Sequence, residues 1–320
     1  MSRDLSTTFL FPGQGAQKLG MAIDLVDRYP RARAVFETGR EILGRDFLAI
    51  CRDGPEEELS STRVSQPAIF LHSMAVLEVL GDRFGVAAPF CRAGTARATA
   101  GLSLGEYSAL VFAGSLEFED ALRIVGRRGE WMQEACDAAP GAMVSIMGLA
   151  AEAVEDVVES LRAAGHRVNV ANYNSDEQTV VSGASDDIGV ATARLKEAGA
   201  RRATPLRVAG AYHSPLMASA TRKLEPLLRE VRIRAPLVAF YGNVRGALLS
   251  DPEEIRDGLI RQVEGSVRWK QIARALVDGG VTKAFEVGPG TVLRGLMRNV
   301  SRDVEVTPVG TCDDIESIAT

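Results

Sequence analysis

Histidine, cysteine and excess positive charge are scarce in this chain of 320 residues, and each shortage excludes a class of function. With only three histidines, few side chains can act as a general base near neutral pH. The net charge of −5 argues against a nucleic-acid partner. The cysteines lack metal-ligand spacing, so we expect no metal site, reduced thiols and a cytoplasmic location; they are Cys51, Cys91, Cys136 and Cys312.

Long apolar runs are missing as well. No run approaches the roughly 20 residues that cross a bilayer, and residues 1–8 lack the apolar core of a signal peptide. We therefore expect no contact with a membrane. The hydrophobic content of 46% is ordinary for a globular protein, and the length leaves room for one large domain or for a large domain with a smaller insert.

The most informative pattern present is the G-x-S-x-G pentapeptide from Gly101 to Gly105, which a helix-forming run follows. Small residues around Ser103 let the chain turn sharply from a strand into a helix. The turn exposes the serine hydroxyl and aims a helix N-terminus at the group that the hydroxyl attacks. The pattern alone is weak because glycine and serine are common, but three further segments strengthen the interpretation of Ser103 as a nucleophile.

Two of these segments are glycine-rich turns that follow apolar strands. The first, residues 9–17, holds the amide side chain of Gln14 between two glycines that let the backbone approach a ligand. It is not a dinucleotide fingerprint, because the third glycine comes two positions late, and no P-loop lysine follows. The second, residues 285–290, ends in Gly-Pro-Gly, and a helix through Met297 is expected after it.

The third segment contains the histidine that best fits a general base. His213 lies between a strand-like run and a helix start at Ser214, and loops between rigid elements often carry such bases. A serine nucleophile needs a neighbouring base because its own hydroxyl is hardly ionised at neutral pH. His72 lies in an apolar helical stretch and is expected in the core or at its boundary, and His166 is expected to be a solvated residue at a helix end.

The order of elements predicts a large α/β domain interrupted by a small one. Strands and helices are expected to alternate from Thr7 to about Ala138. The pattern then changes to β-α-β-β-α-β, which is the ferredoxin-like unit, with elements at 143–147, 152–164, 167–173, 178–182, 186–197 and 202–206. The predicted domains are therefore 1–138 plus 207–320 and 139–206. A ligand is expected in the cleft between them, and the acidic tail after Thr311 is expected to be loosely held.

Six motifs together resemble the malonyl-CoA:acyl-carrier-protein transacylases of fatty-acid and polyketide synthesis. The family shows F-P-G-Q-G-x-Q, G-x-S-x-G-E, R-x-x-x-M-Q, N-x-N-S, H-S-P-L-M and E-V-G-P-G. The matching segments here are 11–17, 101–106, 128–133, 172–175, 213–217 and 286–290, in family order and spacing. The resemblance implies an α/β-hydrolase-like large domain with the small ferredoxin-like insert. It also implies transfer of malonyl from malonyl-CoA, through a serine ester, to the phosphopantetheine thiol of an acyl carrier protein, without a further cofactor.

The resemblance also implies a catalytic role for individual residues. Ser103 would be the nucleophile and His213 its base. A main-chain carbonyl, at Gln262 in this sequence, would orient the histidine. The backbone N–H groups of Gln14 and Leu104 would form the oxyanion hole, where losing one donor typically costs about two to three powers of ten in rate.

Three residues are assigned to the substrate by the same resemblance: Arg128, Asn174 and Tyr212. Arg128 would pair with the malonyl carboxylate, for which a planar guanidinium is the natural partner. The alternative for Arg128 is a solvated helix arginine like Arg123 and Arg127. Asn174 matches a polar residue near the site, and the ring of Tyr212 would wall off the acyl pocket.

Two positions depart from the commonest bacterial pattern. Leu102 replaces a frequent histidine before the nucleophile, which removes a polar group but leaves the role of Ser103 intact. Tyr212 replaces a frequent phenylalanine, and its hydroxyl leaves the strictness of malonyl selection open. An editing hydrolase and a non-catalytic carrier-binding protein are the two other functions considered. Arg128 argues against the hydrolase, and the presence of both Ser103 and His213 argues against the non-catalytic protein.

The expected partner is an acidic carrier protein, and the chain is expected to be a monomer. Arg294 and Arg298 are four residues apart on the helix expected after Gly290, so they share one face and would present a cationic patch near the cleft. The alternative is an ordinary solvated helix face. The sequence does not distinguish fatty-acid synthesis from a polyketide pathway.

Overall fold

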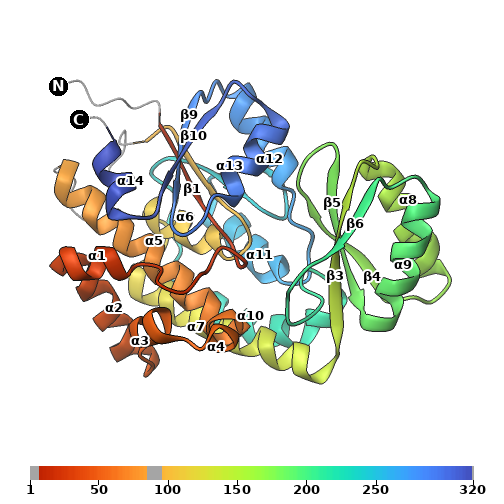
Figure 1. The fold of residues 1–320 in the computed structure, drawn as a ribbon, viewed down its shortest axis with the longest axis horizontal. Coiled ribbons are helices and arrows are strands. Elements are labelled where there is room, and N and C mark those ends of the chain that lie inside the picture. Colours follow the sequence, from red (N-terminus) through yellow and green to blue (C-terminus); the bar gives the residue numbers. More distant parts are fainter. Residues whose placement is uncertain (1–6, 85–95, 319–320) are drawn as a thin grey trace.

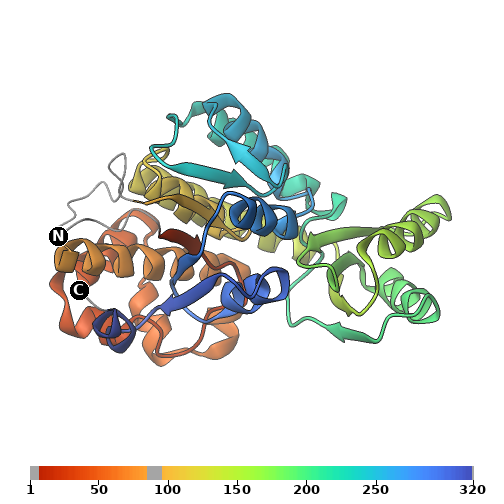
Figure 2. The same ribbon diagram turned by 90° about the horizontal axis from the view of Figure 1, so that it is seen from above.

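The computed structural model describes residues 7–84 and 96–318, which form a large and a small part side by side (Figure 1). Cys91 lies outside these residues. The small part, drawn in green, projects from one end of the large part in both views (Figure 2). The strands are β1 (Thr8–Phe11), β2 (Ala98–Gly101), β3 (Gly141–Met147), β4 (Val168–Tyr173), β5 (Gln178–Ala184), β6 (Arg202–Pro205), β7 (Ala239–Gly242), β8 (Ala247–Leu249), β9 (Lys283–Val287) and β10 (Glu305–Val309).

The large part is built on a six-stranded sheet in the order β10-β9-β1-β2-β7-β8. All neighbours pair in parallel except β7 and the edge strand β8. Side chains alternate between the two faces of a strand, so β1 contributes to two cores. Phe11 joins the larger apolar core, whereas Leu10 joins a second core on the other face.

Helices cover both faces of this sheet. The helices of the large part are α1 (Ile23–Arg28), α2 (Pro30–Leu43), α3 (Phe47–Asp53), α4 (Glu56–Ser60), α5 (Thr62–Phe84), α6 (Gly105–Phe112), α7 (Phe118–Ala138), the 3₁₀ turn η1 (Pro215–Met217), α10 (Ala218–Glu230), α11 (Pro252–Gln262), α12 (Trp269–Asp278), α13 (Val292–Val300) and α14 (Cys312–Ser317). The larger core takes residues from α1 to α7, and the second core takes residues from α12 and α13. The short helix α6 is buried along its whole length, which places the turn before it at the centre of the molecule.

The small part contains the predicted β-α-β-β-α-β order. Its sheet runs β4-β5-β3-β6, and all of its strand pairs are antiparallel. Helices α8 (Ala151–Ala163) and α9 (Ser185–Glu197) pack on it around a core of its own. Backbone hydrogen bonds between Val267 and both Ala171 and Tyr173 join β4 to the large part. The fold class is therefore α/β, with a mainly parallel sheet and a second, small antiparallel sheet.

Several expectations from the sequence need correction. Strands and helices do not simply alternate before residue 138, because the described residues between β1 and β2 form five helices and no strand. The acidic tail is not loosely held: Thr311 caps α14 with a capping box, and Ile315 is fully buried in the larger core. His166 is not a free solvated residue, because its Nδ1 lies 2.7 Å from Asp187 Oδ1 and the side chain is only 31% exposed.

One helix has the length and apolar composition of a membrane span. It is Thr62–Gly81, within α5, and 89% of its most apolar window is buried inside the structure. The sequence analysis expected no run of this length. This degree of burial is typical of a helix in a protein core, and α5 packs against α2 and α7.

Candidate active site

Ser103 occupies a strained turn between β2 and α6. Its φ is 52°, in the left-handed region that non-glycine residues rarely adopt. A Cβ on Gly101 would lie 2.0 Å from the Gly105 carbonyl, and one on Gly105 would lie 2.1 Å from the Phe11 carbonyl. Both positions must therefore be glycine for the chain to turn this tightly. The geometry is that of a nucleophile elbow, as the pentapeptide predicts.

His213 faces this serine from the loop that follows the small part. Its Nε2 lies 2.9 Å from Ser103 Oγ, and its own φ is 57°. Nδ1 lies 2.8 Å from the Gln262 carbonyl oxygen and 3.0 Å from that of Gly265. Carbonyl oxygens only accept hydrogen bonds, so the proton sits on Nδ1 and Nε2 is free to accept from the serine. Burial, together with the nearby charge of Arg128, lowers the pKa of His213 to about 4, so the imidazole is neutral at pH 7.

Arg128 is fully buried and points at the same serine. Its Nη2 donates to Ser103 Oγ at 3.0 Å and to Gln262 Oε1 at 2.9 Å, and its Nη1 donates to Gln66 Oε1 at 2.6 Å. Within the described part of the chain no carboxylate forms an ion pair with it. Burial lowers the pKa of Arg128, because desolvation disfavours the charged form. The guanidinium thus lies beside the nucleophile, ready for an anion.

The burial of Arg128 separates it from the arginines around it. Arg123 and Arg127 are 50% and 60% exposed and pair with carboxylates on their own helix, whereas Arg128 is 0% exposed. The periodicity of α7 contains a signal for this difference: a stripe of buried residues at helical spacing includes position 128. The stripe is Ala121, Val125, Arg128, Met132 and Ala135.

Gln262 does more than the sequence analysis expected. Besides its carbonyl, its side chain accepts from Arg128 and donates to the Ser103 carbonyl at 2.8 Å and to Glu106 Oε2 at 2.5 Å. Burial raises the pKa of Glu106 to about 7. Glu106 Oε1 also accepts from the Asn243 N–H at 3.0 Å. Gln262 therefore links the elbow and the arginine through its side chain and the histidine through its carbonyl.

The two amides predicted to form the oxyanion hole belong to Leu104, which follows the serine, and to Gln14, whose loop runs against the elbow at the Leu102 carbonyl. Neither Leu104 N–H nor Gln14 N–H donates a hydrogen bond to any residue that the structure describes. The side chain of Gln14 is held separately: Nε2 donates to the Tyr212 hydroxyl at 3.2 Å, and Oε1 accepts from Gln66 Nε2 at 3.3 Å. Tyr212 is 6% exposed and bonds Thr62 through its hydroxyl, an interaction that a phenylalanine could not make.

Asn174 is buried near the end of β4, but its side chain makes no hydrogen bond with the serine, the histidine or Arg128 among the described residues. Two other asparagines form hydrogen bonds with the backbone of Ser103 and His213, and the sequence analysis missed both. Asn243 Oδ1 accepts from Ser103 N–H at 2.6 Å, and Asn169 Nδ2 donates to the His213 carbonyl at 2.7 Å. No local motif marks either residue, since each lies far from its partner in sequence. His72 is buried away from these contacts, on the Gly310 carbonyl.

This arrangement combines three functions of an acyl-transfer site. A serine lies in hydrogen-bond contact with a neutral, oriented imidazole, which suits nucleophilic attack on a carbonyl. Two backbone N–H groups without a partner in the described chain are available as donors: that of Leu104 at the start of α6, where negative charge is favoured, and that of Gln14 in the loop after β1. A buried cation lies 3.0 Å from the serine oxygen. The described residues contain no cluster of three or more histidine, cysteine or acidic side chains suited to a metal.

Comparisons with known proteins agree with this geometry. Residues 8–311 match the model of the acyl transferase domain. The chain is 39% identical over 308 residues to the malonyl CoA-acyl carrier protein transacylase of Bacillus subtilis, covering 96% of this chain and 94% of that protein. It is also 39% identical over 292 residues to the protein of the same name from Escherichia coli K12, covering 91% and 92%.

Solved structures resemble the chain over nearly its whole length. An acyl carrier protein S-malonyltransferase from Vibrio cholerae superimposes with a TM-score of 0.90 at 37% identity, covering 98% of this chain and 100% of that one. A malonyl-transacylase solved in complex with its type II PKS acyl-carrier protein gives a TM-score of 0.89 at 36% identity, with 98% of each chain covered.

Proposed function

Because the chain belongs to the malonyl-CoA:acyl-carrier-protein transacylase family, we propose that it moves a malonyl group from malonyl-CoA to the phosphopantetheine thiol of an acyl carrier protein, in fatty-acid or polyketide synthesis. One observation carries the proposal beyond acyl transfer in general. Arg128 is fully buried, has no carboxylate partner among the described residues and lies 3.0 Å from Ser103 Oγ. A short acyl group that ends in a carboxylate satisfies that cation while its thioester carbonyl meets the serine.

In the first half-reaction Ser103 Oγ attacks the thioester carbonyl, and His213 Nε2 takes the hydroxyl proton. Negative charge develops on the carbonyl oxygen, which the N–H groups of Leu104 and Gln14 would bind. The tetrahedral intermediate collapses, the C–S bond breaks, and His213 returns the proton to the departing CoA thiol. The product is a malonyl ester on Ser103.

In the second half-reaction the carrier thiol attacks this ester, with the same residues acting in reverse. His213 takes the thiol proton, the ester C–O bond breaks, and the proton passes to the Ser103 oxygen. A Ser-His pair is sufficient because the group that leaves in the first half-reaction is a thiolate, a better leaving group than an amine. The Gln262 and Gly265 carbonyls take the orienting role that an aspartate has in the Ser-His-Asp triad.

The geometry of the site weighs against the two other functions. An editing hydrolase for uncharged acyl chains has no use for a buried cation beside its nucleophile. A non-catalytic carrier-binding protein has no need of a serine and a neutral histidine 2.9 Å apart. Tyr212 and Asn174 remain predicted substrate contacts, and the monomeric state remains a prediction.

The domain boundaries are part of the proposal. We assign residues 139–206 to a ferredoxin-like domain and residues 1–138 plus 207–320 to the catalytic domain. A separate core in the small part and a site formed by Ser103, before the insert, and His213, after it, support this division. The described cysteines (Cys51, Cys136 and Cys312) are free and buried, which supports reduced thiols and a cytoplasmic location.

Intact-mass measurement after incubation with malonyl-CoA tests the central step. The wild-type protein should gain one malonyl group, and Ser103→Ala should gain none, because it lacks the attacking oxygen. A panel of other acyl-CoAs serves as the control for selectivity. An adduct that persists in Ser103→Ala would show that another residue is the nucleophile.

A further inference from the structure

The loop that carries Gln14 has little stiffness of its own. Gln14 lies between Gly13 and Gly15, and Gly15 has a φ of +101°. Glycines on both sides leave the backbone broad conformational freedom. The loop also runs close against the elbow, since a Cβ on Gly13 would lie 2.5 Å from the Leu102 carbonyl oxygen. A small movement of this loop would therefore displace the Gln14 N–H from the oxygen that it is proposed to bind.

Hydrogen bonds of the Gln14 side chain restrain this loop. Gln14 Nε2 donates to the Tyr212 hydroxyl at 3.2 Å and, at 3.5 Å, to Thr62 Oγ1, and its Oε1 accepts from Gln66 Nε2. The Tyr212 hydroxyl lies 2.5 Å from Thr62 Oγ1, and both side chains are buried. We call the group formed by Gln14, Thr62 and Tyr212 the hydroxyl junction. It joins three segments: the loop after β1, the first residue of α5 and the loop that carries His213.

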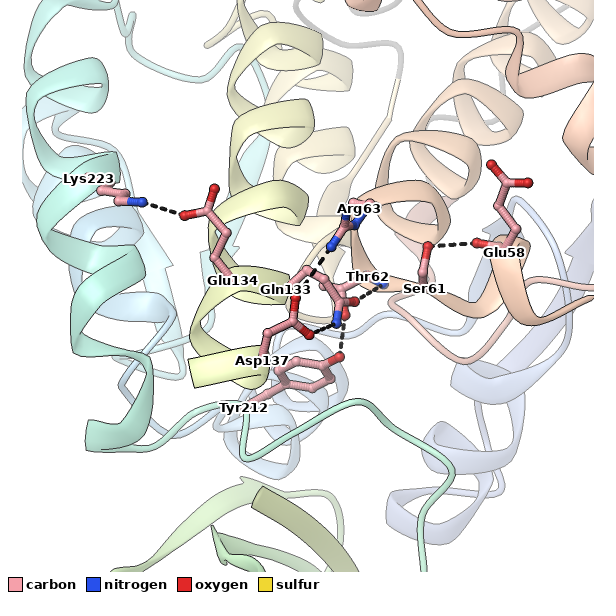
Figure 3. A network of polar contacts seen from close by, with 9 residues as sticks. All are labelled: Glu58, Ser61, Thr62, Arg63, Gln133, Glu134, Asp137, Tyr212 and Lys223. Carbon is pink, nitrogen blue, oxygen red and sulfur yellow. Dashed lines mark hydrogen bonds and ion pairs between the residues drawn. The ribbon is translucent and has the colours of Figure 1, made fainter. Parts of the chain in front are cut away.

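Gln133 fixes the hydroxyl junction from outside the site (Figure 3). Thr62 N–H donates to Gln133 Oε1 at 3.0 Å, so a side chain of α7 satisfies the first N–H of α5. Gln133 Nε2 in turn donates to Asp137 Oδ1 at 2.8 Å. Gln133 is the last residue of the R-x-x-x-M-Q motif, but it has no role in the proposed reaction. Its contacts hold Thr62 with a defined orientation toward Tyr212.

We propose that Thr62 and Gln133 are positioning residues that hold the loop carrying Gln14, by way of Tyr212 and the Gln14 side chain. The inference rests on the proposed function, because it assigns the Gln14 N–H to the oxyanion. Neither residue touches the substrate. Their effect is confined to the transition state, where the oxyanion exists, and leaves substrate binding largely unchanged.

This role differs from that of Arg128 in a measurable way. Arg128 serves acyl groups that carry a carboxylate. The oxyanion develops on every acyl donor that Ser103 attacks, so loosening the loop slows charged and neutral donors alike. Malonyl-CoA and 4-nitrophenyl acetate, a neutral ester, therefore separate the two effects.

The experiment measures the rate of Ser103 acylation with both donors in Thr62→Val, which removes the hydroxyl but keeps the side-chain shape. We expect the acylation rate to fall roughly tenfold with each donor, part of the two to three powers of ten that a full oxyanion donor is worth, with little change in the KM for malonyl-CoA. Thr62→Ser, which keeps the hydroxyl, should retain most of the wild-type rate. Gln133→Met should slow both donors in the same way.

Tyr212→Phe removes the Thr62 hydrogen bond and also the hydroxyl that accepts from Gln14 Nε2, so it should be the slower single variant, and Thr62→Val/Tyr212→Phe should be no slower than Tyr212→Phe. Glu134→Gln is the matched control, because Glu134 neighbours Gln133 on α7 but faces Lys223 across the surface (Figure 3). Wild-type rates in Thr62→Val with both donors would overturn the inference, as would a loss confined to malonyl-CoA. Failure of wild-type protein to form any malonyl adduct would instead refute the proposed function, while 4-nitrophenyl acetate would still test the hydroxyl junction.

Discussion

A single buried arginine gives this site its proposed preference for an acid-bearing acyl group. The hydrogen-bond partners of Arg128 among the described residues are neutral: Gln66, Gln262 and Ser103. Its Nε is buried without a partner. Neutral amides orient a guanidinium without neutralising it, so the charge stays available for a ligand. A carboxylate in place of either glutamine would compete with the substrate for the same donors.

Arg128→Ala should therefore impair malonyl transfer selectively. Loss of the carboxylate contact should cost about 3 kcal/mol of transition-state binding, on the order of a hundredfold in kcat/KM. Transfer of acetyl, which has no carboxylate, should change little or improve. Steady-state kinetics with malonyl-CoA and acetyl-CoA measure the two, with Arg127→Ala on the exposed side of α7 as the control. Equal losses for both substrates would argue against a specific carboxylate contact.

At the scale of one element, helix α13 follows a turn that a buried carboxylate organises. Glu286 at the end of β9 accepts from the N–H groups of Leu293 and Arg294, each at 2.8 Å. This fixes the first turn of α13, and Arg294 and Arg298 then project from its exposed side. Neither forms a salt bridge with a carboxylate of the described chain. Arg298 also lines a surface hollow with Thr291 and with Gln178 of the small part.

Charge reversal of this pair, Arg294→Glu/Arg298→Glu, should raise the KM for the carrier protein at low ionic strength. An acidic carrier would be steered by such a patch, and the effect should fade as salt screens it. Transfer to free pantetheine should change little, because that acceptor lacks the carrier surface. Arg40→Glu/Arg45→Glu, in the last turn of α2 and just after that helix, changes the net charge equally and serves as the control. An unchanged KM for the carrier protein would show that the carrier does not dock on this face of α13.

The whole molecule depends on contacts between distant parts of the chain, and His72 makes one of them. Its Nε2 lies 2.7 Å from the Gly310 carbonyl oxygen, which joins α5 to the end of β10. Burial lowers the pKa of His72 to about 4. The unfolded chain titrates near 6.5, so it binds a proton between these two pH values while the folded protein does not. The contribution of His72 to stability is therefore present above about pH 6.5 and is lost as the pH falls toward 4.

His72→Gln should flatten this pH dependence while keeping a donor for Gly310. Between about pH 6.5 and 4.5 the parent should lose up to about 1.4 kcal/mol of unfolding free energy per pH unit more than the variant. Urea unfolding of both proteins at several pH values measures the difference. The comparison cancels other groups that titrate in this range, such as Glu106 and Glu286, whose burial raises their pKa to about 7. Parallel stability curves would contradict the assignment.

The sequence by itself determined the local features of this protein. The pentapeptide from Gly101 to Gly105 predicts the turn at Ser103, because the clashes that require glycine there arise within one short segment and the strand beside it. The β-α-β-β-α-β order of the insert follows from periodicity, and the structure confirms it to within two residues at each end. The shortage of histidine left few candidates for the base, and His213 does contact the serine.

Only the tertiary structure decided which polar groups meet around that serine. Asn243 is 140 residues from Ser103 in sequence, Gln262 is 134 from Arg128, and Tyr212 is 150 from Thr62. Such pairs depend on how whole helices and strands pack, and no local propensity encodes them. The environment of the charged group at the site also depends on tertiary packing. Arg128 and Arg127 are chemically identical neighbours, and only the packing of α7 against α5 and the elbow buries one of them. Burial removes water from Arg128, and a desolvated cation with neutral partners is the feature that turns a serine-histidine pair into a proposed malonyl site.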